Sequence, residues 1–356
     1  MKKFLLFLFI MVIIFGLSFW FAGGKKIISS FDNNKTYKFT EQKINDINTL
    51  DDCRLFSNGI LTYNNQKITY MDYENNPIWM NENRVFTENV FVSGDYIYKC
   101  LENGIEILDK DNHTYVITEI QGEVLNVSRE NNSAFIITKQ NSGKNSLYIL
   151  NENNEVVLEN KQYNDSITGV ALNDKSDSYC ISTIKYIDGK IKNTLSYNLI
   201  DDMELWNKTI DGEVIIKIKI VDNSILVLGT GNIYCFNLNG SLMWKNSNYN
   251  RIKDFQISNK GKKIYILYEQ DEKIELFGYN FEGKVKEIYK LPKNIEKFKI
   301  FDDKIYVYDE HSVNLLHDNI VDKLFEKLDS QIIDFDVINN NLHILLKDEL
   351  VSGKIK

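Results

Sequence analysis

A short phrase of two strands and a turn recurs along almost the whole chain. Its clearest copy is 232–246, NIYCFNLNGSLMWKN, in which Asn239-Gly240 separates two runs of alternating apolar residues. An Asn-Gly pair in that setting is a strong signal for a β-hairpin. Six further copies lie at 68–79, 105–116, 147–158, 195–206, 274–287 and 313–324. The chain is therefore built from repeated hairpins.

The spacing of these turns predicts the architecture. We compare the residue expected at the second turn position of each copy, which is Asn76, Asn112, Asn154, Asp202, Gly240, Gly283 or Asn319. Neighbouring turns lie 36 to 48 residues apart. A repeat of roughly 40 residues that contains only strands and turns is typical of a β-propeller. We expect an all-β fold with four strands in each blade.

The two ends of the repeat region predict how the ring closes. The last repeat, from Ile332 onward, has three strands, whereas the strand expected at Thr36–Thr40 has no hairpin partner nearby. We predict that Thr36–Thr40 completes the last blade, because a shared blade removes the exposed edges of an open ring. The propeller would then comprise residues 27–356 with eight blades, or seven if one repeat is miscounted.

Residues 1–26 are predicted to form a membrane anchor. Lys2-Lys3 precede the apolar run Phe4–Ala22, and a helix of 19 residues just crosses the hydrocarbon of a bilayer. A cleaved signal peptide is the alternative, but Trp20 would stand at the −3 position, where cleavage requires a small residue. The short basic N-terminus favours a propeller on the extracytoplasmic side, although Lys25-Lys26 weaken that assignment.

The charge balance argues against a nucleic-acid partner. The formal net charge is −8, and residues 1–26 hold four lysines and no acidic residue, so the rest of the chain has 38 basic and 50 acidic residues. Binding to nucleic acid requires a basic face. We expect partners at the membrane and in the cell envelope instead.

No pattern in the sequence predicts a catalytic, cofactor or metal site. Asp109-Lys110-Asp111 begins like a calcium loop, but Thr114 and Ile120 stand where such loops have Gly and Glu. His311 and His317 are six residues apart without a third ligand in pattern. The nucleophile motif of α/β-hydrolases and the glycine-rich nucleotide motifs are also missing from the sequence.

The four cysteines fall in four different repeats, without metal-ligand spacing: Cys53, Cys100, Cys180 and Cys235. Each stands beside apolar strand residues, so we predict buried thiols. A disulfide between neighbouring blades is the alternative, since exported proteins permit one.

Three tryptophans are predicted to have a structural role. Trp79, Trp206 and Trp244 each follow the turn of their repeat by three or four residues. We predict that they pack between neighbouring blades, and stacking on a ligand is the alternative.

The unit IYCFNLNGSLMWK resembles the repeat of the quinoprotein-dehydrogenase-like (PQQ-like) propellers, in which an aromatic-rich strand, a turn and a Trp recur. The resemblance covers about Leu50–Lys356 and implies the fold. One anchor followed by Asn- and Lys-rich repeats also resembles uncharacterised membrane-anchored propeller proteins of Gram-positive bacteria. Catalytic quinoproteins carry a vicinal cysteine pair that this sequence lacks, so no quinone cofactor is expected.

Two functions remain. The first is a non-catalytic, surface-tethered platform that docks an envelope protein or polymer. The second is an exported enzyme of lyase or hydrolase type with its site at the ring mouth. Asp, Glu and His converging from several blades would favour the enzyme. A mouth lined by aromatic residues and polar loops would favour the platform.

Overall fold

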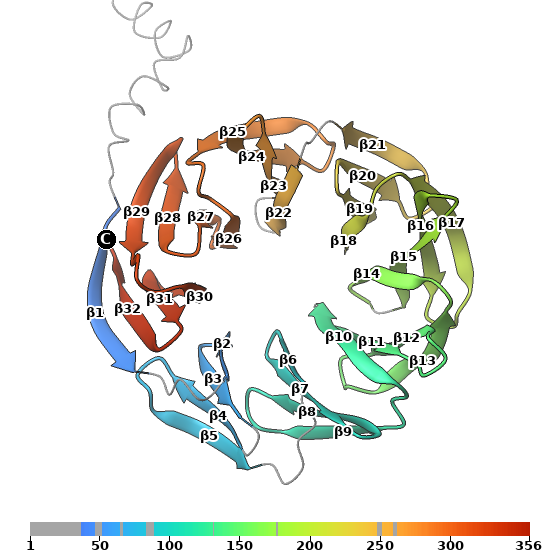
Figure 1. The fold of residues 1–356 in the computed structure, drawn as a ribbon, viewed down its shortest axis with the longest axis horizontal. Helices are drawn as coiled ribbons and strands as arrows, with labels where there is room; N and C mark the ends of the chain where they lie inside the picture. The colour runs from blue at the N-terminus through green and yellow to red at the C-terminus, as the bar shows by residue number, and fades with distance from the viewer. Residues whose placement is uncertain are drawn as a thin grey trace, which may run out of the picture.

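The computed structural model describes residues 37–46, 52–64, 67–82, 89–130, 132–175, 177–247, 251–258 and 262–356. These residues form eight antiparallel sheets of four strands each. Figure 1 shows the sheets arranged radially, as blades, around an open centre. The prediction of an all-β propeller with eight four-stranded blades is confirmed, and the seven-blade alternative is wrong. The predicted anchor, Phe4–Ala22, lies outside the described residues.

The strands occupy equivalent places in every blade. The inner strands are β2 (Asp52–Phe56), β6 (Val90–Ser93), β10 (Glu123–Glu130), β14 (Ser166–Leu172), β18 (Ile215–Val221), β22 (Arg251–Ser258), β26 (Lys297–Phe301) and β30 (Ile332–Ile338). The second strands are β3 (Gly59–Tyr63), β7 (Tyr96–Leu101), β11 (Ser133–Lys139), β15 (Ser178–Ile187), β19 (Ser224–Gly229), β23 (Lys263–Gln270), β27 (Lys304–Tyr308) and β31 (Asn341–Leu346). The third strands are β4 (Lys67–Asp72), β8 (Gly104–Asp109), β12 (Asn145–Leu150), β16 (Lys190–Leu199), β20 (Asn232–Asn237), β24 (Lys273–Asn280), β28 (Ser312–His317) and β32 (Glu349–Ile355). The outer strands are β5 (Pro77–Glu82), β9 (Thr114–Thr118), β13 (Val156–Tyr163), β17 (Glu204–Asp211), β21 (Leu242–Ser247), β25 (Val285–Leu291), β29 (Ile320–Glu326) and β1 (Phe39–Asp46).

The last blade takes its outer strand from the N-terminal side of the chain. β1 pairs antiparallel with β32, so that Phe39 lies opposite Ile355 and Asp46 lies opposite Glu349. The backbones of Lys38 and Lys356 also exchange two hydrogen bonds of 3.1 and 2.9 Å. The sequence placed this strand at Thr36–Thr40, whereas it begins at Phe39 and continues to Asp46. It is longer because β32 offers paired backbone as far as Glu349.

The ring has two different faces. Because every blade is an up-and-down meander, its connections alternate between them. We call the face that carries the turns from inner to second strand and from third to outer strand the turn face. The opposite face, which carries the turns from second to third strand and the links between blades, is the connection face. β1 begins at the turn face, since Phe39 pairs with the end of the third strand β32.

The core lies between neighbouring blades rather than at the centre of the ring. Ile60, Ile97 and Ile225 on second strands have no exposed surface, and neither do Ile68 and Ile105 on third strands. These strands are covered on both sides, which explains their continuous apolar runs. Outer strands instead alternate between covered and exposed residues, because blades diverge toward the circumference.

The turns between third and outer strands have the backbone geometry that their sequence predicts. The expected residues have positive φ angles in six blades: Asn112 (65°), Asn154 (61°), Asp202 (74°), Gly240 (79°), Gly283 (75°) and Asn319 (64°). In the first blade the prediction of Asn76 is wrong by one residue, since Asn75 has the positive φ of 69°. Asn76 precedes Pro77, and a residue before proline is restricted to extended conformations.

Candidate functional site: the central channel

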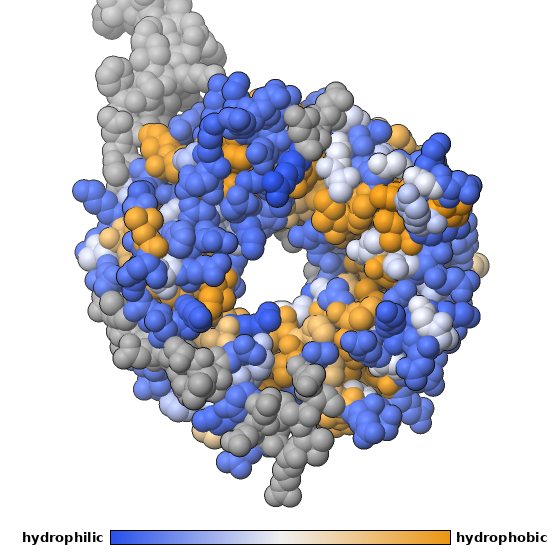
Figure 2. Space-filling model, viewed as in Figure 1, coloured by the Kyte–Doolittle hydropathy of each residue, from blue (hydrophilic) through white to orange (hydrophobic). Residues whose placement is uncertain are grey.

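A channel runs through the centre of the ring and is lined by the inner strands. Figure 2 shows it as a hole, with apolar surface along the rim from β6 to β20 and hydrophilic surface over β22 to β26. Its wall therefore differs from one side to the other. Charged residues occur on inner strands all around the ring except β6 and β14, and β18, β22, β26 and β30 supply Lys217, Lys219, Lys253, Asp254, Lys297, Lys299, Asp334 and Asp336.

Most of the lysines on this side are paired with a carboxylate. Lys219 of β18 pairs with Glu130 of β10, two blades away. Lys253 Nζ lies 2.9 Å from Glu296 Oε1 and also donates to the carbonyl oxygen of Ile295 (3.0 Å). Lys299 of β26 pairs with Asp334 of the next inner strand. The pairs of Lys253 and Lys299 join neighbouring blades, and the pair of Lys219 joins blade five to blade three across the channel wall.

Asp254 is half-buried in the wall between β22 and β26. Its Oδ1 accepts the N–H of Phe255 (2.7 Å) and its Oδ2 accepts the N–H of Phe298 (3.2 Å). Burial raises the pKa of this carboxyl group, while the two backbone donors oppose that shift. Oδ1 therefore bonds within β22, and Oδ2 joins blade six to blade seven.

A cavity of about 670 Å³ occupies the turn-face half of the channel between blades three and six. Its lining combines charged and apolar side chains, among them Glu130, Lys217, Lys219, Phe255, Gln256 and Lys262. A cavity of this size accommodates a small organic ligand. Sequence reasoning missed these residues, because they come from four blades and are brought together only by ring closure.

Three exposed apolar side chains lie at the other mouth of the channel, on the connection face. Five inner strands carry a β-bulge near their start, at Leu125, Thr168, Ile216, Lys253 and Ile333. A bulge changes the direction in which the side chain of the extra residue points. Leu125, Ile216 and Ile333 are consequently 45%, 48% and 49% exposed. A regular strand would direct large apolar residues inward, so this mouth has the composition of a binding surface.

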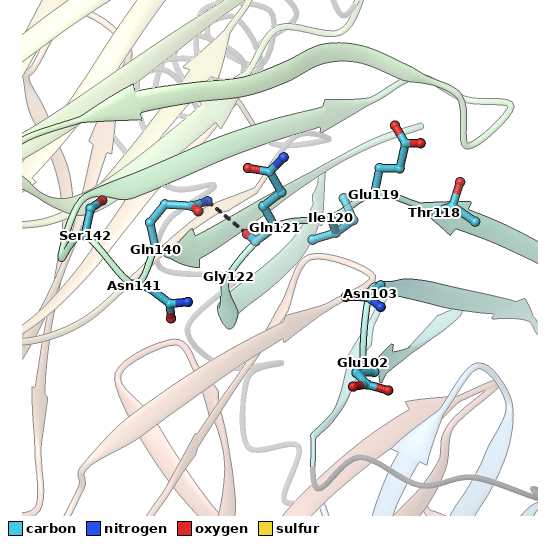
Figure 3. Close-up of a pocket in the computed structure, with 10 residues that line it drawn as sticks. All are labelled: Glu102, Asn103, Thr118, Glu119, Ile120, Gln121, Gly122, Gln140, Asn141 and Ser142. Carbon is cyan, nitrogen blue, oxygen red and sulfur yellow. Dashed lines mark hydrogen bonds between the residues drawn. The ribbon is translucent and has the colours of Figure 1, made fainter.

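The connection face also carries a second hollow, of about 710 Å³, between blades two and three. Figure 3 shows Gln140 donating to the Gln121 carbonyl oxygen on one side, and Glu102 and Glu119 on the other. Glu119 has a positive φ of 72° and its N–H donates to the Asn103 carbonyl oxygen at 2.9 Å. The hollow is polar and its exposed carboxylates suit a cationic or amide-rich group.

The three predicted tryptophans lie between blades, at the turn face. Each is half-buried and donates its Nε1–H to a turn carbonyl of the following blade: Trp79 to Lys110 (2.8 Å), Trp206 to Leu238 (2.8 Å) and Trp244 to Phe281 (2.9 Å). The indoles of Trp206 and Trp244 lie on the turn glycines. A Cβ added at Gly240 would be 2.8 Å from Trp206 Cδ2, and one added at Gly283 would be 2.6 Å from Trp244 Cδ2.

The residues weighed as metal ligands have other partners. Asp109, Asp111 and His113 do place their ligand atoms within 4.8 Å of one another. However, Asp109 Oδ1 accepts the N–H groups of Asp111 (2.9 Å) and His113 (2.8 Å), which fixes the turn. His311 and His317 do not meet, since His311 Nδ1 lies 2.9 Å from the Ser330 carbonyl oxygen and His317 Nε2 lies 2.7 Å from Asp322 Oδ2.

The cysteines follow the prediction of buried thiols. Cys100, Cys180 and Cys235 are free and buried, and Cys53 is half-buried. Burial raises the pKa of Cys100 and of Cys235 to about 11, and it raises the pKa of Cys180 as well. These thiols are therefore protonated and poorly reactive near neutral pH.

Comparison with known proteins identifies a family and a fold. A family model described as "Family of unknown function (DUF5711)" matches residues 29–352. No curated protein sequence matches the chain. Within the part of the chain that the structure describes, there is also no helix long and apolar enough to cross a membrane.

Several solved propellers resemble the ring over most of its length. The structure of Sqt1 from Chaetomium thermophilum has a TM-score of 0.59 at 9% identity and covers 89% of this chain and 99% of that chain. BamB from Moraxella catarrhalis has a TM-score of 0.53 at 15% identity, again with 89% and 99% covered. The WD40 domain of SCAP from fission yeast has a TM-score of 0.50 at 10% identity, with 89% and 98% covered. At these identities the likeness is one of fold.

Proposed function

The chain belongs to the family of unknown function DUF5711, and from its fold and surface we propose that it is a membrane-tethered, extracytoplasmic platform that binds a protein of the cell envelope. Propellers host many activities, so the proposal depends on the surface and not on the fold. Three features support it. They are the place where the chain enters the ring, the exposed side chains on the connection face, and the paired charges of the channel.

The entry point of the chain orients the ring. β1 begins at the turn face, and just before it the N–H of Tyr37 donates to Asp322 Oδ2 on blade seven (2.7 Å). With the apolar run Phe4–Ala22 as the anchor, the turn face lies toward the membrane and the connection face points away from it. The connection face is then the one that an envelope partner can reach.

The observation that carries the proposal is the set of apolar side chains on the connection face. Besides Leu125, Ile216 and Ile333 at the channel mouth, Tyr186 is 73% exposed at the end of the long β15–β16 hairpin and Leu328 is 76% exposed between β29 and β30. These five residues come from different blades on one face, and exposed apolar residues on one face are typical of protein-binding surfaces. They favour a protein over a polar envelope polymer.

Other surface features support the same reading. The net charge of −8 opposes binding to nucleic acid. The carboxylates of Glu130, Glu296 and Asp334 are held in ion pairs with lysines, which favours a binding ring over an exported lyase or hydrolase. The contacts between tryptophans and turns support placing the chain among the quinoprotein-dehydrogenase-like propellers, without a quinone cofactor.

Photo-crosslinking in the native cell tests the proposal. A photoreactive amino acid placed at Ile216 or Leu328 on the connection face should give a discrete protein adduct. The matched control is Met243, which is 54% exposed but lies on outer strand β21. Adding Ile333→Asp should remove the adduct at Ile216 without lowering the melting temperature. Equal adducts at Met243, or adducts that survive Ile333→Asp, would contradict a binding site at this mouth.

A further inference from the structure

The cavity in the turn-face half of the channel contains a lysine whose charge no carboxylate neutralises. The cavity has a volume of about 670 Å³. Lys217 projects into it from β18, and its ammonium group donates to the carbonyl oxygen of Phe255 at 3.3 Å. Among the residues that the structure describes, no carboxylate lies within ion-pair distance of this group. A carbonyl accepts a hydrogen bond but does not balance a full charge.

Two of the other cations around the cavity, Arg129 and Lys219, have partners, and the third, Lys262, is exposed at the rim. The guanidinium of Arg129 donates to Tyr98 Oη (3.1 Å) and Asn154 Oδ1 (2.8 Å) and lies 3.7 Å from the ring centre of Tyr96. Lys219 pairs with Glu130, which also accepts the N–H of Leu172 at 3.3 Å. The remaining charged residues, Asp174, Asp222 and Lys262, belong to turns at the rim.

The neighbouring blades show that the bond to the Phe255 carbonyl does not require a charge. In blade six the neutral amide of Gln256 donates to the carbonyl oxygen of Phe298 in the next blade. In blade seven Lys299 donates to the carbonyl oxygen of Phe335 (2.9 Å), and Asp334 neutralises it. One position in this ladder is therefore neutral and one is paired. At the Phe255 carbonyl the donor is Lys217, which stands two residues before the strand position that Gln256 and Lys299 occupy in their blades, and no carboxylate among the described residues pairs with it.

We infer that this cavity binds a small organic anion, a carboxylate or phosphate monoester with an apolar part, and that Lys217 holds its charged group. The apolar part would lie against Leu172, Phe255 and Phe281, which line the same cavity. The volume of the cavity is in the range of small-molecule sites, and its lining of charged and polar groups beside a few apolar side chains suits a ligand that carries a charge. Such a site would exist whether or not a protein docks on the connection face.

Electrostatics in the cavity support the inference. The side chain of Lys217 remains exposed to the solvent of the cavity. The surrounding protein partly desolvates it, which is the main cause that lowers the pKa of Lys217; Lys219 lowers this pKa further, while Asp254 and Glu130 oppose the shift. An anion beside it would reverse that effect, because an opposite charge within a few ångströms stabilises the protonated amine.

Calorimetric titration of the full-length chain, kept in solution with a non-ionic detergent, tests the site. Phenyl phosphate and benzoate serve as anionic probes, and benzyl alcohol and benzylamine serve as neutral and cationic controls. We expect at least one anion to bind saturably and at least tenfold more tightly than either control. The stronger of the two anions identifies the charged group as phosphate or carboxylate. Equal binding of all four probes, or of none, would overturn the inference.

The variants Lys217→Gln and Lys299→Gln distinguish anion binding at Lys217 from a general electrostatic attraction of anions into the channel. Each variant lowers the net charge of the channel wall by one. Each also introduces a glutamine, the residue type whose amide donates to a neighbouring blade at Gln256. Lys217→Gln should weaken anion binding at least tenfold, whereas Lys299→Gln should change it by less than threefold. Equal losses in both variants would show a diffuse field rather than a site.

Acetylation of the unmodified protein gives a readout that does not depend on a variant's folding. With acetic anhydride and peptide mapping by mass spectrometry, whichever of phenyl phosphate and benzoate binds more tightly should slow acetylation of Lys217 at least threefold. Benzyl alcohol should not slow it, and Lys299 should be unaffected by either. Protection of Lys217 by benzyl alcohol alone, or no protection at all, would mean that the cavity does not hold an anion at this lysine.

Discussion

Replacing Trp244 by alanine should destabilise the ring by breaking a joint between blades five and six. The half-buried indole lies on Gly283 and donates to the Phe281 carbonyl oxygen at 2.9 Å. Losing about 100 Å² of apolar contact costs about 2.5 kcal/mol at 25 cal/mol per Å². The hydrogen bond adds about 1 kcal/mol. The free energy of unfolding should therefore fall by about 3–4 kcal/mol.

Thermal unfolding measures this change directly. An entropy of unfolding of about 2.1 cal/mol/K per residue gives about 0.7 kcal/mol per kelvin for a ring of this length, so the melting temperature should fall by about 5 °C. Trp244→Phe keeps much of the ring contact and loses the hydrogen bond, so its fall should be about 1–2 °C. A shift of Trp244→Ala within 1 °C would refute a packing role and would favour a ligand role.

A double-mutant cycle with Gly283 tests whether the contact itself is responsible. Gly283 has a φ of 75°, and its added Cβ would meet the indole of Trp244 at 2.6 Å. Gly143→Ala is the matched control, because Gly143 has a φ of 83° and nothing lies within 4 Å of its added Cβ. Each alanine costs about 1–2 kcal/mol through its backbone. Gly283→Ala should cost more than Gly143→Ala in the natural protein and the same in Trp244→Ala. Additive effects would refute the reasoning.

Three further predictions concern the tether, the closure and the thiols. Protease added to cells stripped of their wall should digest the propeller and leave a membrane fragment near residues 1–30, and complete protection would place the ring in the cytoplasm. Removing residues 1–26 should leave a soluble ring that unfolds cooperatively. Removing residues 1–44 takes away most of β1 and exposes the edge of β32, so it should lower the melting temperature by many degrees. Equal melting temperatures of the two deletion variants would show that the shared blade is not needed for stability. Iodoacetamide at pH 8 should alkylate Cys100 and Cys235 at least ~100-fold more slowly in the native than in the unfolded chain, since a pKa of about 11 leaves little thiolate. Because these folded pKa values are raised, stability should fall as pH rises above the unfolded value of about 8.5, and a flat profile from pH 8 to 11 would contradict thiol burial.

The turns show what the sequence determined by itself. A positive φ is a property of a few consecutive residues, and Gly, Asn and Asp adopt it at low cost. The repeat of such residues therefore predicted the positions of most turns, and the structure decided between eight and seven blades. The one error, Asn76 for Asn75, also has a local cause, in Pro77. The sequence also indicated that strands such as β11 and β12 are buried on both sides, because such burial requires continuous apolar runs.

The spacing of apolar residues on the inner strands also contains a signal for the β-bulges, which the repeat pattern alone does not indicate. Segments such as 215–218, IIKI, and 332–335, IIDF, have buried residues three positions apart, at Ile215 and Ile218 and again at Ile332 and Phe335. A regular strand alternates with a period of two, so it cannot bury both. An extra residue between them resolves the conflict, and it directs Ile216 and Ile333 to the channel mouth.

Only the tertiary structure decided which charges are neutralised. Lys217 and Lys219 are two residues apart on one strand and look equivalent in the sequence. Lys219 finds Glu130, which is 89 residues away, because ring closure brings blades three and five to the same channel. Lys217 donates to the carbonyl oxygen of Phe255 instead. Charge pairing depends on distances between side chains of different blades, and no local pattern encodes those distances.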